Sequence, residues 1–287
     1  MIFLFLACRS STLPVCAQFG QDVFLEVPAG VFWMGEVGVE PYTVPLHTVG
    51  IAESFCLAQH ETTQRLYQRI MNKNPSKHKG DEHPVENITW YDALEFSNAW
   101  SIEEGLKPCY SIGQESSKTG AKIRDVTLIT ECTGFRLPTE AEWEWAARHG
   151  RGGHVLKQDF DAEVWKSMAK DLKQNQRVYA GGKDLEQHVW YKNNSDGHHH
   201  PVGTKSQDQW GFYDMGGNVS EWVWDSFKEY PSSFQLNPNP GDIPHIRVSR
   251  GGGWSDRANM MRVAVRSGDG PDWSFDWVGL RLVKNQE

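Results

Sequence analysis

Residues 250–283, RGGGWSDRANMMRVAVRSGDGPDWSFDWVGLRLV, carry the side-chain types best suited to binding chemistry. Trp273, Phe275 and Trp277 stand among Ser, Asp and Gly residues in this segment. Rigid aromatic side chains lose little entropy on binding, and short polar side chains supply adaptable hydrogen bonds. The segment therefore predicts a ligand-binding surface. The alternative is that its rings fill the core, and this alternative applies most to Trp254, beside strand-like text.

The same segment alternates predicted strands with polar loops. RGGGW, RVAVR and VGLRLV have the apolar, period-two pattern of strands, whereas SDRAN and SGDGPDWSFDW are typical of loops. In RVAVR, Val263 and Val265 share one face and Ala264 shares the other with the arginines, so one face packs and the other is available for display. The candidate ligand-binding residues are Trp254, Ser255, Asp256, Arg257, Asn259, Val265, Ser267, Asp269, Trp273, Phe275, Asp276 and Trp277.

Residues 214–221, DMGGNVSE, are a candidate calcium site. Asp214 and Glu221 flank a tight glycine turn, and the backbone carbonyls of Gly217 and Val219 lie between them. Ca²⁺ binds such mixed carboxylate and carbonyl oxygens from one loop, and an ion here would be structural. The alternative is that both carboxylates cap turns by accepting hydrogen bonds from backbone N–H groups.

Residues 198–200, HHH, invite a metal-binding interpretation. Consecutive side chains cannot all converge on one ion, so a solvated loop is the preferred interpretation. The sequence contains no nucleophile elbow, phosphate-binding loop or H-E-x-x-H zinc motif.

The five cysteines indicate export. MIFLFLAC at residues 1–8 resembles the end of a bacterial lipoprotein signal with Cys8 as the lipidated residue, although it lacks a basic start. The alternative is an apolar tail or a buried first strand. Cys109 and Cys132 flank a loop-like insert, and a disulfide between them would close about 22 intervening residues and add roughly 3 kcal/mol. The alternative is four unpaired, buried thiols.

Composition limits the class of protein. With 39% apolar and 23% charged residues, the chain of 287 residues can bury a core, and its 13 Trp and 27 Gly indicate a loop-rich fold with an aromatic interior. The net charge of −8 argues against nucleic-acid binding, which needs a clustered basic surface.

Regular elements are expected mainly in the first half. Residues 23–36 have a hairpin signature, and residues 47–61 are extended. Helices are predicted over residues 62–71, 89–105 and 135–150, with N-caps at Thr62 or Thr63, at Thr89 and at Thr139. Residues 151–247 lack helical patterning, so their loops should be held on the core by Trp and Tyr.

Six phrases in order resemble the formylglycine-generating enzyme (sulfatase-modifying factor) family. They are VPAGVFWMG (27–35), HPVENITWYDALEFSNAWS (83–101), GFRLPTEAEWEWAARHG (134–150), WGFYDMGGNVSEWVWDSF (210–227), RVSRGGGWS (247–255) and VGLRLV (278–283). The resemblance implies an α+β, C-type-lectin-like fold with few helices, short antiparallel sheets and much irregular structure. It also implies a calcium site at the positions matching 214–221.

The resemblance does not carry the family's activity with it. Its enzymes oxidise a substrate cysteine with a copper-binding cysteine pair, which would fall within residues 253–266, and no cysteine is present there. Met260 and Met261 are thioethers, but neighbouring residues of a strand point to opposite faces, so they cannot replace two converging thiolates.

The C-terminal framework is similar to that of another branch with this fold, the variable proteins of diversity-generating retroelements. That resemblance implies a non-catalytic protein whose last segment, about 250–283, is a diversified binding surface. The expected chain is a monomer on the outer surface of a bacterial cell, with a signal at 1–8, a tether at 9–22 and one domain at 23–287. It would bind an unidentified protein or glycan, contact the membrane only through a lipid anchor, and hold no cofactor besides structural calcium.

Two alternative functions stay open. One is a formylglycine-generating oxidase that uses another metal centre, and the other is a calcium-dependent glycan-binding lectin.

Overall fold

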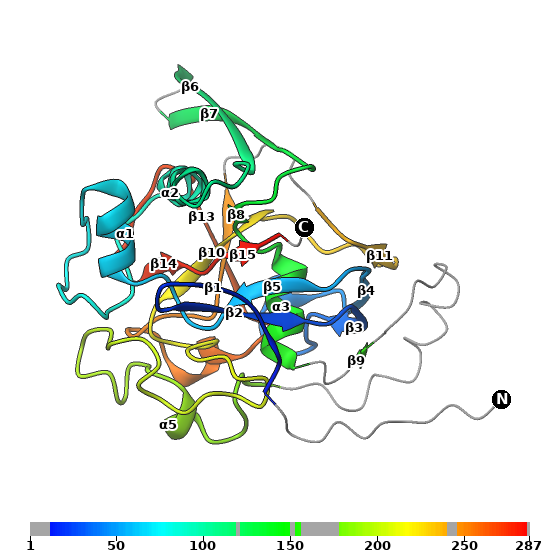
Figure 1. The fold of residues 1–287 in the computed structure, drawn as a ribbon. Helices are drawn as coiled ribbons and strands as arrows, with labels where there is room; N and C mark the ends of the chain where they lie inside the picture. The colour runs from blue at the N-terminus through cyan, green and yellow to red at the C-terminus, as the bar shows by residue number, and fades with distance from the viewer. Residues whose placement is uncertain (1–11, 119–120, 150–152, 156–177, 240–245, 286–287) are drawn as a thin grey trace.

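The computed structural model describes residues 12–118, 121–149, 153–155, 178–239 and 246–285. Its sheets are small, and irregular backbone joins them (Figure 1). The expected α+β class is confirmed, although two strand pairs, β10 with β14 and β4 with β11, are parallel. Within the described residues, no helix is long and apolar enough to cross a membrane.

Three sheets and a hairpin contain the strands. The five-stranded sheet has the order β1 (Val15–Phe19), β2 (Asp22–Val27), β5 (Phe55–Ala58), β15 (Val283–Lys284), β8 (Phe135–Arg136). One four-stranded sheet has the order β13 (Arg266–Asp269), β12 (Arg247–Arg250), β10 (Ser220–Ser226), β14 (Val278–Leu280). The other has the order β11 (Gln235–Leu236), β4 (His47–Ile51), β3 (Gly30–Met34), β9 (Gly153–Val155). The hairpin β6 (Tyr110–Lys118) and β7 (Ala121–Leu128) extends away from them (Figure 1).

The three helices expected from the sequence are present. They are α1 (Gln64–Met71), α2 (Trp90–Glu103) and α3 (Glu140–Arg148), with N-caps at Thr63, Thr89 and Thr139. The last two threonines form complete capping boxes with acidic residues at the third helical position. Short helical turns follow at η1 (Pro41–Thr43), α5 (Leu185–His188) and η2 (Ala258–Met261).

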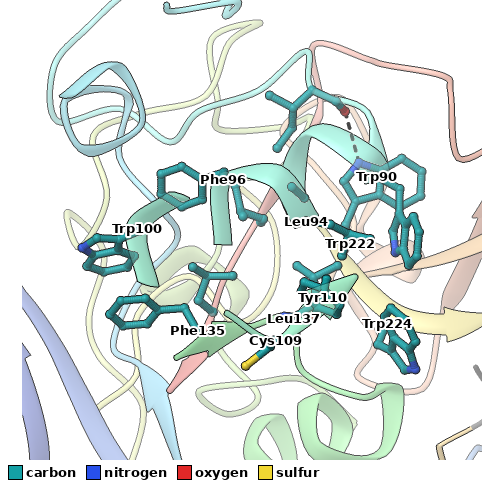
Figure 2. Close-up of a cluster of buried hydrophobic side chains, with 14 of the residues drawn as sticks. Trp90, Leu94, Phe96, Trp100, Cys109, Tyr110, Phe135, Leu137, Trp222 and Trp224 are labelled. Atoms are coloured by element: carbon teal, nitrogen blue, oxygen red, sulfur yellow. Dashed lines mark hydrogen bonds between the residues drawn. The ribbon is translucent and has the colours of Figure 1, made fainter. Parts of the chain in front are cut away.

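The core around α2 is aromatic, as the composition predicted (Figure 2). Trp100 stacks on Phe135 with ring centroids 3.8 Å apart, and Tyr110 stacks on Trp224 at 5.2 Å. The Trp90 indole donates a hydrogen bond of 2.9 Å to the Val223 carbonyl, so this buried ring leaves its polar atom satisfied. The rings therefore join α2 to strands from distant parts of the chain.

The tether expected at residues 9–22 is wrong from Val15 onward. Residues 15–19 form β1, which pairs with β2 at the edge of the five-stranded sheet. The Phe19 ring packs against Phe24, Trp100 and Phe135 at centroid distances of 5.0–6.0 Å. This aromatic burial makes the segment part of the domain. Cys8 lies outside the described residues.

Two disulfides join distant segments. Cys16 of β1 is bonded to Cys56 of β5, and Cys109 is bonded to Cys132, the pair expected from the sequence. Four of the five cysteines are therefore oxidised.

The strand expected at residues 262–266 is also wrong. The chain turns at Val263 and Ala264, and β13 begins only at Arg266. Val263, Ala264 and Val265 are all buried, so this stretch presents no alternating displayed face. The cause is Arg250, whose guanidinium donates hydrogen bonds to the carbonyls of all three residues.

Buried ion pairs join α3 to the C-terminal segment. Arg250 pairs with Glu144, which also pairs with Arg148. Arg266 donates to both oxygens of Glu140 at 2.8 and 2.6 Å. We call Glu140, Glu144, Arg250 and Arg266 the α3 clamp. Burial of an unpaired charge is costly, so each member of the clamp requires its partner.

Phe19→Ala should lower the free energy of unfolding by about 2–4 kcal/mol, because it removes a packed ring from the aromatic core. Urea denaturation of the purified protein measures this change. The control is Val15→Ala on the same strand, which should cost less than about 0.5 kcal/mol, because Val15 is 58% exposed. Equal small effects would show that residues 15–19 are a tether after all.

Arg250→Met should destabilise the protein by about 3 kcal/mol or more, since it removes Glu144's partner and three carbonyl contacts. The exposed Arg257, in the same segment, provides the control, and Arg257→Met should change stability by less than about 0.5 kcal/mol. Thermal denaturation distinguishes the two variants, and a loss of similar size in both would contradict the clamp.

Candidate ligand-binding site

Three aromatic rings of the loop between β13 and β14 lie together at the surface. Trp273 is 57% exposed and Trp277 is 38% exposed, while Phe275 between them is half-buried. Phe275 stacks on Trp277 at 4.7 Å, and Trp273 meets Phe275 edge-on at 6.3 Å. We call Trp273, Phe275 and Trp277 the aromatic row. The two tryptophan rings are exposed, and their contacts with Phe275 hold them in place.

The backbone of the aromatic row is attached at defined points. The Phe275 carbonyl accepts a hydrogen bond of 2.9 Å from the Asn87 N–H, and the Trp277 carbonyl accepts one of 2.8 Å from the Ser220 N–H. Asp276, between them, pairs with Lys77 at 2.6 Å. The loop is thus fixed by main-chain contacts that do not depend on the identity of the exposed side chains.

Trp254 supports this loop and is itself half-buried. Its indole donates a hydrogen bond of 2.9 Å to the Asp276 carbonyl, and its N–H donates one of 2.8 Å to the Asn218 carbonyl. Asp256 accepts a hydrogen bond of 2.9 Å from the Gly253 N–H and so closes the turn that carries Trp254. Trp254 therefore neither fills the core completely nor lies fully at the surface. Its ring is half-buried, and its indole N–H holds the loop through Asp276.

The remaining predicted contact residues divide into three groups. Ser255 is half-buried in the same turn, and Arg257 and Asn259 are exposed at η2. Ser267 and Asp269 lie in the edge strand β13, opposite β12. Val265 is only 4% exposed, so its assignment to the binding surface is wrong: the Arg250 contacts turn it into the core.

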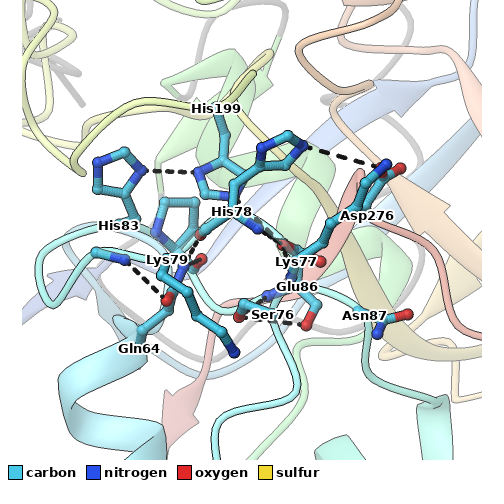
Figure 3. Close-up of polar contacts among 12 residues, drawn as sticks. Gln64, Ser76, Lys77, His78, Lys79, His83, Glu86, Asn87, His199 and Asp276 are labelled. Atoms are coloured by element: carbon cyan, nitrogen blue, oxygen red, sulfur yellow. Dashed lines mark hydrogen bonds and ion pairs between the residues drawn. The ribbon is translucent and has the colours of Figure 1, made fainter. Parts of the chain in front are cut away.

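A cluster of histidines, which the sequence did not predict, lies beside Asp276 in the loop that carries the aromatic row (Figure 3). The solvated loop expected at residues 198–200 is wrong for His199, which is fully buried. The His199 Nδ1 lies 3.0 Å from the His83 Nδ1, and its Nε2 lies 3.5 Å from Glu86. The sequence signal was KHKGDEHPVE at 77–86, which places two histidines and three acidic residues in one short stretch.

Burial lowers the pKa of several of these histidines. Burial, followed by the charge of His199, lowers the pKa of His83 to about 4 and lowers that of His78. Burial also lowers the pKa of His200. The neutral form of His78, His83 and His200 is therefore favoured in the folded protein at neutral pH.

The predicted calcium ligands do not fit an ion. Glu221 accepts two hydrogen bonds from Arg281 through Oε1, at 2.9 and 2.8 Å, and one of 2.6 Å from the Trp143 indole through Oε2. The Asp214 Oδ2 accepts from the Gly203 N–H at 2.8 Å, and burial raises the pKa of Asp214 to about 6.

Arg281 supplies the positive charge that an ion would bring to these carboxylates. The Arg281 guanidinium also interacts electrostatically with the carboxylates of Glu61 and Asp214. In the described part of the chain, no three His, Cys, Asp or Glu side chains form a group that could hold a metal. Gly217 and Val219 contribute instead to the turn, where the Gly217 N–H donates to the Gly251 carbonyl and the Val219 N–H donates to Glu61.

The residues that would hold copper in an enzyme of the resembled family are also missing. The cysteine-free interval 253–266 is occupied by the Trp254 turn, η2 and the buried 263–265 turn. Met261 is buried beside Val189 and Tyr191, and only Met260 reaches the surface in part. Their positions differ, so the two thioethers are not a matched ligand pair.

Comparison with known proteins agrees with this fold. A relative from Paenibacillus barcinonensis named chaperone protein LppX is 30% identical over 100% of this chain and 99% of its own length. The formylglycine-generating enzyme of Streptomyces coelicolor is 30% identical over 66% of this chain and 59% of its own. The inactive C-alpha-formylglycine-generating enzyme 2 of Bos taurus is 33% identical over 52% of this chain and 44% of its own.

One solved structure is similar over nearly its full length. Treponema denticola variable protein 1 superposes with a TM-score of 0.76 at 28% identity, covering 96% of this chain and 99% of that one. Residues 13–286 match the family model described as sulfatase-modifying factor enzyme 1-like domain. With the fold, the clamp and the ordered motifs, this match shows that the chain belongs to the sulfatase-modifying factor (formylglycine-generating enzyme) family.

Proposed function

We propose that this chain is a non-catalytic, ligand-binding member of its family, with the aromatic row at the centre of the binding surface. The observation that carries the proposal is the exposure of Trp273 and Trp277 on a loop whose backbone is fixed. Exposed tryptophans held in one arrangement lose little entropy on binding, which is the property of binding anchors.

Neighbouring polar groups complete the surface. Lys77 and Asp276 form an exposed pair beside Trp277, and Ser274 donates to the Asn87 side chain at 3.1 Å. A polar rim around aromatic anchors is the usual anatomy of an interface. The ligand is a protein or a glycan, because the net charge of −8 disfavours nucleic acids.

The similarity to a variable protein supports a surface that tolerates substitution. The loop is held by main-chain hydrogen bonds at Phe275 and Trp277, so their side chains are free to change. The proposed variable positions exclude Val263, Ala264 and Val265, whose burial requires apolar side chains of similar size.

The cysteine chemistry supports a non-enzymatic role. Four of the five cysteines form disulfides, and none lies in residues 253–266. Soft sulfur ligands suit Cu(I), and all four cysteines in the described part of the chain are held in disulfides.

We also propose that the protein is an exported monomer, anchored to the outer surface of a bacterial cell through a lipid on Cys8. Two disulfides are consistent with an oxidising compartment, and the apolar run before Cys8 is the basis for the anchor. Radiolabelled palmitate incorporation that is lost in Cys8→Ala would support the anchor, and equal labelling of both proteins would refute it.

The double variant Trp273→Ser/Trp277→Ser should lose binding about tenfold or more, since two anchors are removed, with little change in thermal stability. Binding is measured on a printed glycan array and on a displayed peptide library, using the wild-type hits as probes. The control is Tyr42→Ser, because Tyr42 is equally exposed but lies on η1.

Two further arms separate the alternatives. Glycan binding abolished by EGTA would indicate a calcium-dependent lectin, and copper-dependent oxidation of a sulfatase cysteine peptide would indicate an oxidase. Either result, or unchanged binding by the double variant, would contradict the proposed function.

A further inference from the structure

A group of imidazoles from two loops lies close to Asp276, in the loop that carries the aromatic row, and to Trp254, which supports that loop. We call His78, His83, His198, His199 and His200 the histidine cluster. Each ring contacts the next in space. The centroid distances are 5.1 Å from His83 to His199, 5.5 Å from His199 to His78, 6.2 Å from His78 to His198 and 4.8 Å from His198 to His200. The cluster has no part in the binding surface as described above.

Hydrogen bonds, an ion pair and a ring contact connect the histidine cluster to the loop that carries the aromatic row. The buried Glu86 Oε1 accepts hydrogen bonds from the backbone N–H groups of Lys77 and His78, at 2.5 and 2.9 Å. Lys77 in turn pairs with Asp276, and the His78 ring meets Trp254 edge-on at 5.7 Å. A displacement of residues 77–78 would therefore act on two of the contacts that support the loop, its side-chain ion pair and the Trp254 ring.

The contact between His83 and His199 depends on proton count. Two Nδ1 atoms 3.0 Å apart can share one hydrogen, whether the pair is neutral or carries a single charge. When both rings are protonated, each Nδ1 carries a hydrogen and neither can accept. The two N–H groups then oppose each other, and two like charges lie in direct contact, so the rings must separate.

We propose that the histidine cluster is an acid-sensitive switch that holds the aromatic row in place at neutral pH and releases it when the His83–His199 pair becomes doubly protonated. The inference concerns regulation of the proposed binding surface and rests on that function only for its biological meaning. Separation of the rings moves the 77–86 loop away from residues 198–200, and this movement disturbs the contacts of Lys77 with Asp276 and of His78 with Trp254.

The charges facing these rings decide the direction of the effect. His83 faces His198, His199 and His200, all of which oppose a second positive charge. His78 faces His199 and Lys77, which oppose protonation, and Glu86 and Asp276, which favour it. His199 faces Glu86 on its Nε2 side.

The sign of the pH dependence follows from these surroundings. The pKa values of His78, His83 and His200 in the folded protein are lower than the usual value of 6.5. The unfolded or released state therefore binds more protons, and the stabilising contribution is complete above pH 6.5. It is lost as the pH falls toward the His83 pKa of about 4.

Hydrogen exchange of single backbone amides tests the switch without any ligand. The reporter is the Asn87 N–H, which is bonded to the Phe275 carbonyl, and the reference is the Trp224 N–H, which is bonded to Pro138 inside the core. Between pH 7 and pH 4.5, corrected for intrinsic exchange, Asn87 protection should fall by about tenfold more than Trp224 protection. In His83→Gln, which keeps a hydrogen-bonding side chain but cannot titrate, this extra fall should shrink to about twofold or less.

Two variants serve as checks. His199→Gln removes the other member of the pair and should give the same result, so a folding defect in one variant leaves the test intact. His47→Gln removes a buried histidine with a lowered pKa that packs on Tyr230, outside the cluster, and should behave like wild type.

Unchanged Asn87 protection in the wild type at pH 4.5 would overturn the switch. A fall in Asn87 protection that is as large in both glutamine variants of the pair as in the wild type would overturn it too. Because the readout involves no ligand, a protein that binds nothing through Trp273 and Trp277 can still show the switch, and a binding protein can lack it.

Discussion

The buried guanidinium of Arg250 is the contact on which the rest of the C-terminal half depends. It bonds Glu144 of α3 and three successive carbonyls, at Val263, Ala264 and Val265, so it fixes the segment that leads from β12 to β13. A buried charge without its partner is costly, and the backbone therefore follows the arginine. Arg266 with Glu140 repeats the arrangement at the start of β13.

The same logic explains how a fixed frame can carry an exposed loop. The loop between β13 and β14 begins beyond Arg266 and ends before Arg281, whose guanidinium is buried against Glu221. Between these two ion pairs, the backbone contacts of Phe275 and Trp277 hold the chain, while Trp273 and Trp277 face solvent. Arg281 also places a positive charge beside Glu221, one of the carboxylates of the predicted calcium site.

Local signals predicted the helices well, but the hairpin expected at residues 23–36 is wrong, because β2 and β3 pair with other strands in two different sheets. The threonine caps and the acidic residues three positions later marked the helix starts, and the aromatic composition predicted the core. The exposed aromatic row was also predicted, because its residue types suit display. The errors are non-local: RVAVR has a strand pattern, but its conformation is decided by Arg250 and by Arg266, which reaches into α3.

The errors in the predicted tether at residues 15–19 and in the predicted exposure of His199 have the same origin. The sequence VCAQF does not predict that the Phe19 ring packs against Phe24, Trp100 and Phe135, which come from three other segments. His199 looked solvated because its neighbours in the sequence are polar, whereas its neighbours in space are His83 and Glu86. Pairing across more than 100 residues leaves no pattern in the short window from which solvation is inferred.

We propose that the exposed loop varies in sequence while the buried arginines that hold the surrounding structure do not. Sequencing the final 45 or so codons from many cells of one lineage tests it most directly. Substitutions are expected at exposed or half-buried positions between Ser255 and Trp277. Arg250, Arg266, Arg281 and residues 263–265 should be unchanged. An absence of variation, or substitutions spread evenly over those arginines and the surface, would contradict it.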